Sequence, residues 1–258
     1  MKKKGKVDII IQARLGSTRL KGKVLKMHRK INILKILVER MKNCKNADEI
    51  IICTTKKTQD NKIVKFCNYE KIKVFRGSNN NVLSRYHLTA KKFKTDVVIR
   101  ITSDCPFVDF RIVDNMIYEF RNKKLDYYAN TYPLPTNYPD GMDIEIFTSN
   151  ALKKANKDAI LPSEREHVTP YFYNSGKFKI GKKRLRENLS KYRFCIDYQS
   201  DFILLKKIIN HFNNKIFTIS MKQLVNFVKI RANLISYQKK IIRNEGWKSS
   251  LLKDEKFK

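Results

Sequence analysis

Apolar residues in the first half of the chain alternate between two patterns, short continuous runs and longer stretches with helical spacing. Continuous runs at 7–11, 50–52, 74–75 and 97–101 are typical of strands buried on both faces of a sheet. Helical spacing within 33–41, 63–67, 82–90 and 112–120 predicts helices between and after these strands. This alternation predicts an α/β fold with a doubly wound, mostly parallel sheet.

The second half is less regular. A turn-rich stretch at 133–141 separates a strand expected at 127–130 from an alternating run at 142–147, which predicts a strand outside the parallel register. We expect another strand at 193–196 and a helix with one apolar face at 202–212. We also expect one long amphipathic helix over 221–242, which favours a packing or dimer helix over one lying on a membrane. These elements predict a main domain over 1–213, with a β excursion at 127–186, and a C-terminal helical extension over 214–258.

Charge is the most unusual feature of the composition, with a formal net charge of +32 over 258 residues. Residues 1–30 carry 11 basic side chains and 1 acidic, and residues 202–258 carry 13 and 3, so the excess lies near the two ends. The tail lacks the interleaved aromatic residues of a nucleic-acid surface, which disfavours specific nucleic-acid binding. No apolar run approaches the roughly 18 residues of a membrane span, and Asp8 interrupts the apolar run near the N-terminus. We expect a cytoplasmic protein without a membrane partner.

The five cysteines, at 44, 53, 67, 105 and 195, form no Cys-x-x-Cys pair and no cluster with histidine. Scattered cysteines of this kind are typical of free thiols in a reducing compartment. The spacing therefore argues against a zinc site.

The loop after the first strand, residues 12–23, is the strongest functional signal. In open α/β sheets ligands bind at the carboxyl ends of the strands, where this loop lies. Gly16 and Gly22 let the backbone approach a ligand closely, while Arg14, Arg19 and Lys23 supply cations for phosphate oxygens. Neither the Gly-x-x-x-x-Gly-Lys-[Ser/Thr] nor the Gly-x-Gly-x-x-Gly pattern is present. The loop predicts polyphosphate binding, the alternative being a solvated basic loop.

Two aspartates also follow expected strands. Asp104 lies after the strand at 97–101, where a carboxylate near a triphosphate can hold Mg²⁺, a cation that prefers oxygen ligands. Its alternative role is to cap a turn before Pro106. Asp197 is a candidate second ligand of the same metal, and Asp201 is expected to cap or brace the helix that follows.

Taken together, these motifs resemble the nucleotide-sugar cytidylyltransferases, the acylneuraminate and 3-deoxy-manno-octulosonate cytidylyltransferases among them. The resemblance is strongest to the branch containing spore-coat polysaccharide biosynthesis protein F. It spans residues 7–247 and rests on the loop at 13–23 and on the stretches at 75–78, 82–86, 104–106, 138–143, 163–171 and 244–247, which occur in the family's order.

The resemblance implies a Rossmann-like, GT-A-like nucleotidyltransferase fold and transfer of CMP from CTP to an acidic or modified sugar for surface polysaccharide. We also expect a homodimer, with either the excursion at 127–186 or the C-terminal helix as its face. It implies that Arg14 and Lys23 hold the phosphates and that Asp104 and Asp197 hold Mg²⁺. The nucleotide site would include Ala13, Arg14, Gly16, Ser17, Arg19, Lys23, Arg76, Ser78 and Thr102. The sugar would face Asp143, Glu164, Arg165 and His167, although residues 164–167 also suit a salt-linked helix start after Pro162.

Some positions depart from the family pattern. Lys21 stands where proline is usual, residues 29–32 replace a Gly-Gly-Lys-Pro turn, and residues 198–200 replace Thr-Pro-Glu. Thr102 stands where some relatives have a glutamine that contacts the base, so the preference for cytosine stays open. Two alternatives remain: a sugar-nucleotide-dependent glycosyltransferase, which would usually show Asp-x-Asp at a strand end, and a basic nucleic-acid-binding protein, which would have no use for Asp104.

Overall fold

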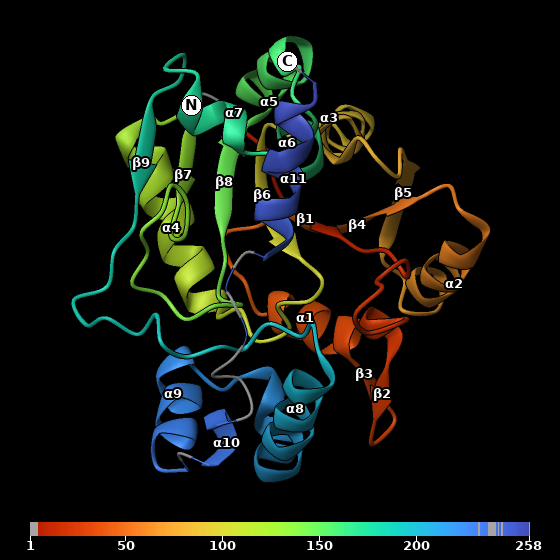
Figure 1. Cartoon of the computed structure of the whole chain (residues 1–258), viewed down its shortest axis with the longest axis vertical. Helices are drawn as coiled ribbons and strands as arrows, with labels where there is room; N and C mark the ends of the chain where they lie inside the picture. Colours follow the sequence, from red (N-terminus) through yellow and green to blue (C-terminus); the bar gives the residue numbers. More distant parts are fainter. Residues whose placement is uncertain (1–4, 232, 237–240, 242, 244, 258) are drawn as a thin grey trace.

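The structure is a computed structural model that describes residues 5–231, 233–236, 241, 243 and 245–257. Its centre is a seven-stranded sheet with the order β5-β4-β1-β6-β8-β7-β9 (Figure 1). The strands are β1 (Val7–Gln12), β4 (Glu49–Thr55), β5 (Lys73–Gly77), β6 (Val97–Thr102), β7 (Tyr127–Ala129), β8 (Glu145–Thr148) and β9 (Ile180–Lys182). Only β8 runs antiparallel to its neighbours, so the predicted mostly parallel α/β sheet is confirmed.

Helices cover both faces of this sheet because successive residues of a strand point to opposite sides. Ile9 and Ile11 of β1 belong to a core shared with one group of helices, and Ile10 belongs to the core on the other face. The first group is α1 (Ile33–Met41), α2 (Asn61–Tyr69) and α4 (Phe110–Lys123). The second is α3 (Val82–Phe93), α5 (Ser149–Asp158) and α7 (Pro170–Asn174).

A third apolar cluster joins the C-terminal helices to the loops at the carboxyl ends of β1 and β6. Its helices are α8 (Gln199–Phe212), η3 (Asn213–Phe217) and α9 (Met221–Lys229). A small hairpin of β2 (Met27–His28) and β3 (Ile31–Asn32) lies against it, since His28 Nε2 is 2.8 Å from Asn210 Oδ1. Arg29 and Lys30 form the hairpin turn with positive φ, so the departure from the family pattern at 29–32 is a tight turn.

The expected long helix over 221–242 is wrong. Helix α9 ends at Lys229, Ile230 is 75% exposed, and a separate short helix, α10, spans Asn233–Ser236. The interruption lets Leu234 enter the same apolar cluster as Leu224 and Val228. In a continuous helix Leu234 would lie about 80° around the axis from Leu224, because ten residues fall short of three whole turns. Residue 242, the expected end, lies outside the described residues.

The expected strand at 193–196 is also wrong. Arg193 makes a single bridge to Asp140, and the Phe194 amide donates to the Asp140 carbonyl over 2.7 Å. The chain then turns away, so that the Ile196 amide donates to the Asp104 carbonyl over 2.8 Å. These extended residues therefore join two loops instead of extending the sheet. The strand expected at 142–147 is present over the shorter span of β8.

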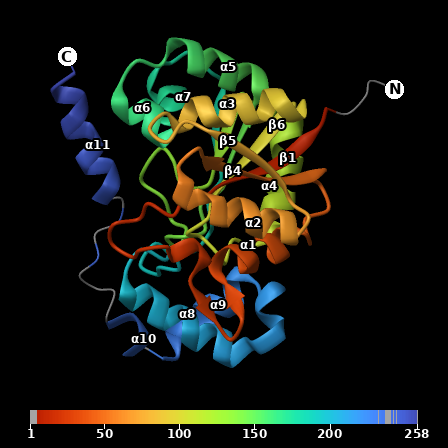
Figure 2. The ribbon, with the colours of Figure 1, turned by 90° about the vertical axis from the view of Figure 1, so that its right-hand side faces the viewer.

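The described parts of the expected C-terminal extension lie in two places. Helix α11 (Glu245–Glu255) lies apart from α8 to α10 and beside α6 (Pro162–His167), as Figure 2 shows. Asp254 of α11 accepts the backbone N–H of Ser163 over 2.9 Å and so helps to cap α6. The boundary drawn between residues 213 and 214 stays a prediction.

Candidate active site

A hollow of about 320 Å³ lies at the carboxyl ends of β1 and β6. The loop after β1 forms one wall, and its course is fixed where the Leu15 amide donates to Asp60 Oδ1 over 2.8 Å. Gly22, with φ of 62°, turns the chain into a short 3-10 helix, η1 (Lys23–Leu25), which begins with Lys23. Of the residues expected to bind nucleotide, those lining the hollow are Ala13, Arg14, Gly16, Ser17, Arg19, Lys23 and Thr102.

Four charged groups that line this hollow meet one another. The Lys23 ammonium donates to Asp104 Oδ2 and to Asp197 Oδ1, each over 2.7 Å. Arg19 Nη2 lies 3.1 Å from the same oxygen of Asp197. The two aspartates are far apart in the chain, yet both contact one cation, as expected from their positions at the ends of predicted strands. The segment before Asp197 is an extended loop instead of a strand.

These contacts shift the pKa values of the partners in opposite directions. Burial alone would lower the pKa of Lys23, but the charges of Asp104 and Asp197 outweigh it and raise the pKa above its usual range. Burial alone would raise the pKa of Asp197, but Lys23, Arg19 and Arg193 together lower it. Lys23 and Asp197 are therefore both charged at neutral pH.

Arg193 fixes the position of Asp197 from behind. Its Nη2 lies 3.0 Å from Asp197 Oδ2 and 3.1 Å from Asp201 Oδ2, and its Nη1 pairs with Asp140. Asp201 is fully buried and accepts the amides of Asp197 and Tyr198, over 2.9 and 3.0 Å. The bracing role expected of Asp201 is confirmed.

A second hollow, of about 220 Å³, adjoins the first. Asp104, Asp197 and Arg19 line both, so the charged cluster stands between them. Among the residues expected to face the sugar, Asp143 and His167 line the second hollow. The rest of its wall includes Tyr132, Glu145, Thr169, Tyr173, Tyr198 and Trp247.

Asp143 and His167 have unusual protonation behaviour. Burial raises the pKa of Asp143 to about 6, although Arg243 and the Thr131 hydroxyl, which donates to it over 2.6 Å, act in the opposite direction. Burial lowers the pKa of His167 to about 4, so its ring is neutral at pH 7. His167 Nε2 is 2.8 Å from the Ser250 hydroxyl, and its ring lies edge-on to Trp247 with centroids 4.9 Å apart.

Four expected site residues lie outside both hollows. Arg76 donates to the carbonyls of Thr55 and Lys57, each over 3.0 Å, and Ser78 accepts the Asn81 amide over 3.0 Å. Glu164 accepts the amides of residues 160 and 161, each over 3.1 Å, and so caps its own helix. Arg165 lies on the wall of another hollow, which it shares with Arg14. Their roles toward nucleotide and sugar stay predictions.

Sequence reasoning missed several charged residues of the site. Arg100 and Glu145 form an ion pair across β6 and β8, and both line the second hollow. Arg243 Nη2 lies 3.3 Å from Asp143 Oδ1. Arg193 could have been predicted as a partner of Asp197, because it lies four residues before it. No nearby residue points to Arg243, because its partner Asp143 lies 100 residues earlier in the chain.

Similarity to known proteins adds an independent finding. A model of the family described as "Cytidylyltransferase" matches residues 9–243. The uncharacterized protein MJ1063 of Methanocaldococcus jannaschii is 38% identical over 86% of this chain and 90% of its own length. Spore coat polysaccharide biosynthesis protein SpsF of Bacillus subtilis is 35% identical over 77% of this chain and 84% of its own.

A solved structure described as a cytidylyltransferase from Leptospira borgpetersenii serovar Hardjo-bovis is 35% identical. It superposes with a TM-score of 0.85, over 93% of this chain and 100% of that one. Among the described residues, no helix combines the length and apolar character needed to cross a membrane. The resemblance seen in the sequence is confirmed, and nucleotidyl transfer is favoured over both alternatives. The chain belongs to the cytidylyltransferase family and is a nucleotidyltransferase.

Proposed function

We propose that this cytidylyltransferase transfers CMP from CTP to a sugar hydroxyl. The hydroxyl oxygen attacks the α-phosphorus, the bond from that phosphorus to the bridging oxygen breaks, and pyrophosphate leaves. The observation that carries the proposal is the cluster of Lys23, Asp104 and Asp197, whose carboxylates stand between two adjoining hollows. One hollow would take the triphosphate and the other the acceptor.

The basic groups of the first hollow suit a triphosphate. Arg14, Arg19 and Lys23 line it from one loop, and arginine forks match phosphate oxygens. We infer that these residues neutralise the charge that develops on the leaving pyrophosphate. Cations positioned for developing charge are the main source of rate in phosphoryl transfer.

Mg²⁺ fits the donor set of the cluster. Asp104 and Asp197 offer hard carboxylate oxygens that converge on one cationic group, 2.7 Å away in each case. These two residues would hold the ion. When bound, Mg²⁺ would neutralise triphosphate charge and align it for in-line attack.

The second hollow suits a hydroxyl-rich acceptor. Asp143 and Thr169 supply hydrogen-bonding groups, and Trp247 and Tyr173 supply apolar surface for a sugar ring. We infer that His167 accepts the proton of the attacking hydroxyl, because its ring lines both hollows and so lies where the two substrates would meet. By analogy with SpsF, the product would serve surface polysaccharide assembly, with an acidic or modified sugar as acceptor. A homodimer and a cytoplasmic location stay predictions.

The test follows pyrophosphate release with each of the four NTPs, Mg²⁺ and a panel of 2-keto-3-deoxy and amino sugars. We expect release that requires CTP and a sugar and is lost in Asp104→Asn. Asp114→Asn is the control, since Asp114 lies on α4 outside both hollows. Failure of the native protein to bind CTP in the presence of Mg²⁺ would overturn the proposal, whereas CTP binding without turnover would direct the search to other sugars.

A further inference from the structure

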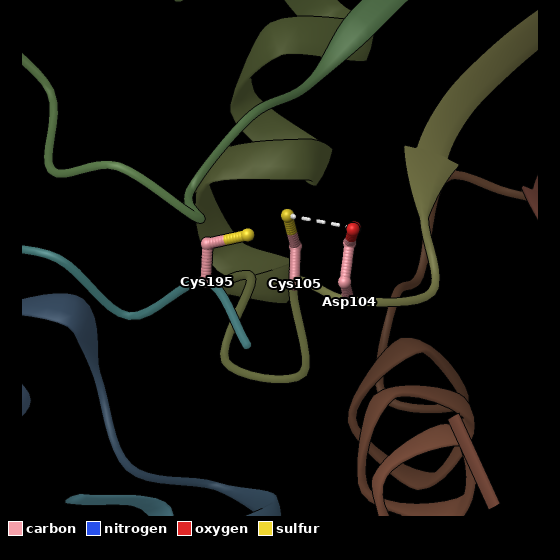
Figure 3. Close-up of side chains that lie close together, drawn as sticks. All are labelled: Asp104, Cys105 and Cys195. Atoms are coloured by element: carbon pink, nitrogen blue, oxygen red, sulfur yellow. Dashed lines mark hydrogen bonds between the residues drawn. The ribbon is translucent and has the colours of Figure 1, made fainter. Parts of the chain in front are cut away.

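Two of the five cysteines, Cys105 and Cys195, meet beside the charged cluster. Cys105 follows β6, and Cys195 lies in the extended segment that bridges to Asp140. Their sulfurs and a carboxylate oxygen of Asp104 all lie within 4.8 Å of one another. Figure 3 shows the Cys105 sulfur between the Cys195 sulfur and the Asp104 carboxylate. The fold thus assembles a set of donors that no local spacing in the sequence reveals.

The spacing of these atoms is close to what a tetrahedral metal requires. With zinc–sulfur bonds of about 2.3 Å, two sulfur ligands stand about 3.8 Å apart, and a sulfur and an oxygen stand slightly closer. Cys105 Sγ is 3.7 Å from Asp104 Oδ1, and Cys195 Sγ is 3.5 Å from Asp197 Oδ2. Small side-chain adjustments would therefore bring the two sulfurs and Asp104 Oδ1 around one ion. Asp197 Oδ2 would join them by exchanging its contact with Arg193 Nη2, 3.0 Å away, for the ion.

The donors can also be reached. Both cysteines are nearly buried, at 1% and 8% exposure, yet both line the second hollow together with Asp104 and Asp197. The two thiols therefore contact a polar space that is open to solvent as well as the apolar core. An ion can arrive through the acceptor hollow when no sugar occupies it.

We propose that this chain has a site for a thiophilic divalent cation, with Zn²⁺ as the probe, formed by Cys105, Cys195 and Asp104, with Asp197 as a fourth ligand. Thiolates select zinc-like ions over Mg²⁺, which prefers oxygen donors only. Binding replaces the two thiol protons with the metal and involves no change of oxidation state.

One consequence rests on the proposed function. Zn²⁺ beside the two sulfurs would neutralise charge on Asp104 and Asp197, so these carboxylates would hold Mg²⁺ in the nucleotide hollow more weakly. Zn²⁺ would therefore inhibit CMP transfer. The zinc site is a separate claim and stands without that reaction.

The test uses Co²⁺ with the full-length protein kept reduced, because cobalt bound to thiolates gives a sulfur-to-metal charge-transfer band and tetrahedral visible bands. We expect both bands to saturate at one equivalent and Zn²⁺ to abolish them. Cys195→Ser and Cys105→Ser should each weaken Zn²⁺ binding by at least ~100-fold, since even partners outside the ligand shell contribute about 10–100-fold. Cys44→Ser is the matched control, because Cys44 also contacts a carboxylate, Asp114, at 3.0 Å but has no second thiol described beside it.

Absence of the charge-transfer band in the native protein at one equivalent of Co²⁺ would overturn the proposal, whatever the variants do. A band that persists in both cysteine variants, shown to be folded by circular dichroism, would overturn it equally. Zinc inhibition of pyrophosphate release is measured separately. If the cobalt bands appear but no CMP transfer is found with any sugar, the metal site stands and the proposed function fails.

Discussion

Lys23 carries more of the expected chemistry than any other single residue of the site. It holds two carboxylates at 2.7 Å and lines the first hollow, the proposed triphosphate site. Replacing it by methionine keeps the length of the side chain and removes the charge. The two aspartates would then lack the cation that lies between them, and the triphosphate would lose one of its cationic partners.

We expect Lys23→Met to lower kcat/KM for CTP by about 10²–10³-fold, the range seen when one preorganised electrostatic contact is removed. Pyrophosphate release under steady-state conditions measures the change. Lys21→Met is the matched control, because Lys21 lies on the same loop but is exposed and lines neither hollow. A folded Lys23→Met protein with native kcat/KM would contradict the role given to this ammonium.

His167 makes a prediction about acid stability. Burial lowers its pKa to about 4 in the folded protein, while the ordinary value near 6.5 holds in the unfolded chain. Between these values the unfolded chain binds more protons, so the free energy of unfolding falls as the pH drops from about 6.5 to 4. Partial exposure limits this contribution to about 1–3 kcal/mol.

Urea unfolding at several pH values tests this. In His167→Gln the decline between pH 6.5 and 4 should be shallower than in the native protein by that amount. His28→Gln, on the exposed hairpin, should keep the native slope. Parallel curves for the native protein and His167→Gln would refute the neutral state of the ring.

The sequence identifies those site residues that act through their own loop. Arg14, Lys23 and Asp104 follow recognisable strands, and parallel strands bring their carboxyl ends to one edge, so their meeting could be predicted. The contact between Cys105 and Cys195 could not be predicted, because it depends on the bridge that places the segment around Arg193 beside Asp140. The same holds for Arg243, whose partner Asp143 lies on a different element.

At the scale of elements, the bridge between Asp140 and Arg193 decides where Asp197 lies. Gly141 follows the bridge with φ of 88°, and a side chain there would put its Cβ 2.6 Å from the Phe194 carbonyl carbon and 2.8 Å from Cys195 Cα. Moving these backbone atoms costs more free energy than moving the end of a flexible side chain. The segment that carries Cys195 and Asp197 would therefore have to move.

We expect Gly141→Ala to lower the free energy of unfolding by several kcal/mol and to reduce pyrophosphate release in step. Gly176→Ala separates the causes, since Gly176 also has positive φ, 68°, but no atom of the described residues lies within 4 Å of the added Cβ. Its cost should be only the backbone strain, about 1–2 kcal/mol. Equal losses in the two variants, measured by urea unfolding, would mean that contact with the 194–195 backbone is unimportant.

The helices and strands whose apolar residues follow a clear periodic pattern were predicted, and the short or irregular elements were not. The strands β1, β4 and β6 and the helices α1, α3 and α4 follow from solid apolar runs and helical spacing, because both faces of the sheet are covered. Strand β9 and the β2–β3 hairpin are too short to leave a period. Helix α9 ends early because the third apolar cluster, and not local propensity, determines where Leu234 packs.

At the scale of the whole molecule, parts of the two basic segments of the sequence lie against each other. Strand β2 and the turn at 29–30 belong to the first segment. His28 lies 2.8 Å from Asn210 of α8, and Arg29 lies 2.8 Å from Asn213 of η3. We call residues 26–30 with 206–215 the basic surface. Residues 26–30 directly follow the loop at 12–25, part of which lines the first hollow. The charges of the basic surface are positioned to attract an anionic nucleotide over distances of about 10 Å at low salt.

Long-range attraction of this kind raises the rate at which nucleotide and protein associate more than the rate of the chemical step. The dependence of KM and kcat on salt concentration distinguishes these two effects. Raising NaCl from about 0.05 to 0.5 M shortens the screening length to a few ångströms, so the KM for CTP should rise several-fold while kcat changes less than about 2-fold. Lys30→Glu combined with Lys207→Glu, both exposed and outside the two hollows, should raise KM at low salt and flatten its salt dependence. Lys62→Glu combined with Lys65→Glu, both exposed on α2 and away from this surface, carries the same change of charge and should leave the salt dependence close to native. If all these substitutions change the salt dependence of KM alike, net charge alone is responsible for it. If added salt lowers kcat and leaves KM unchanged, salt weakens the ion pairs within the site and not the attraction by this surface.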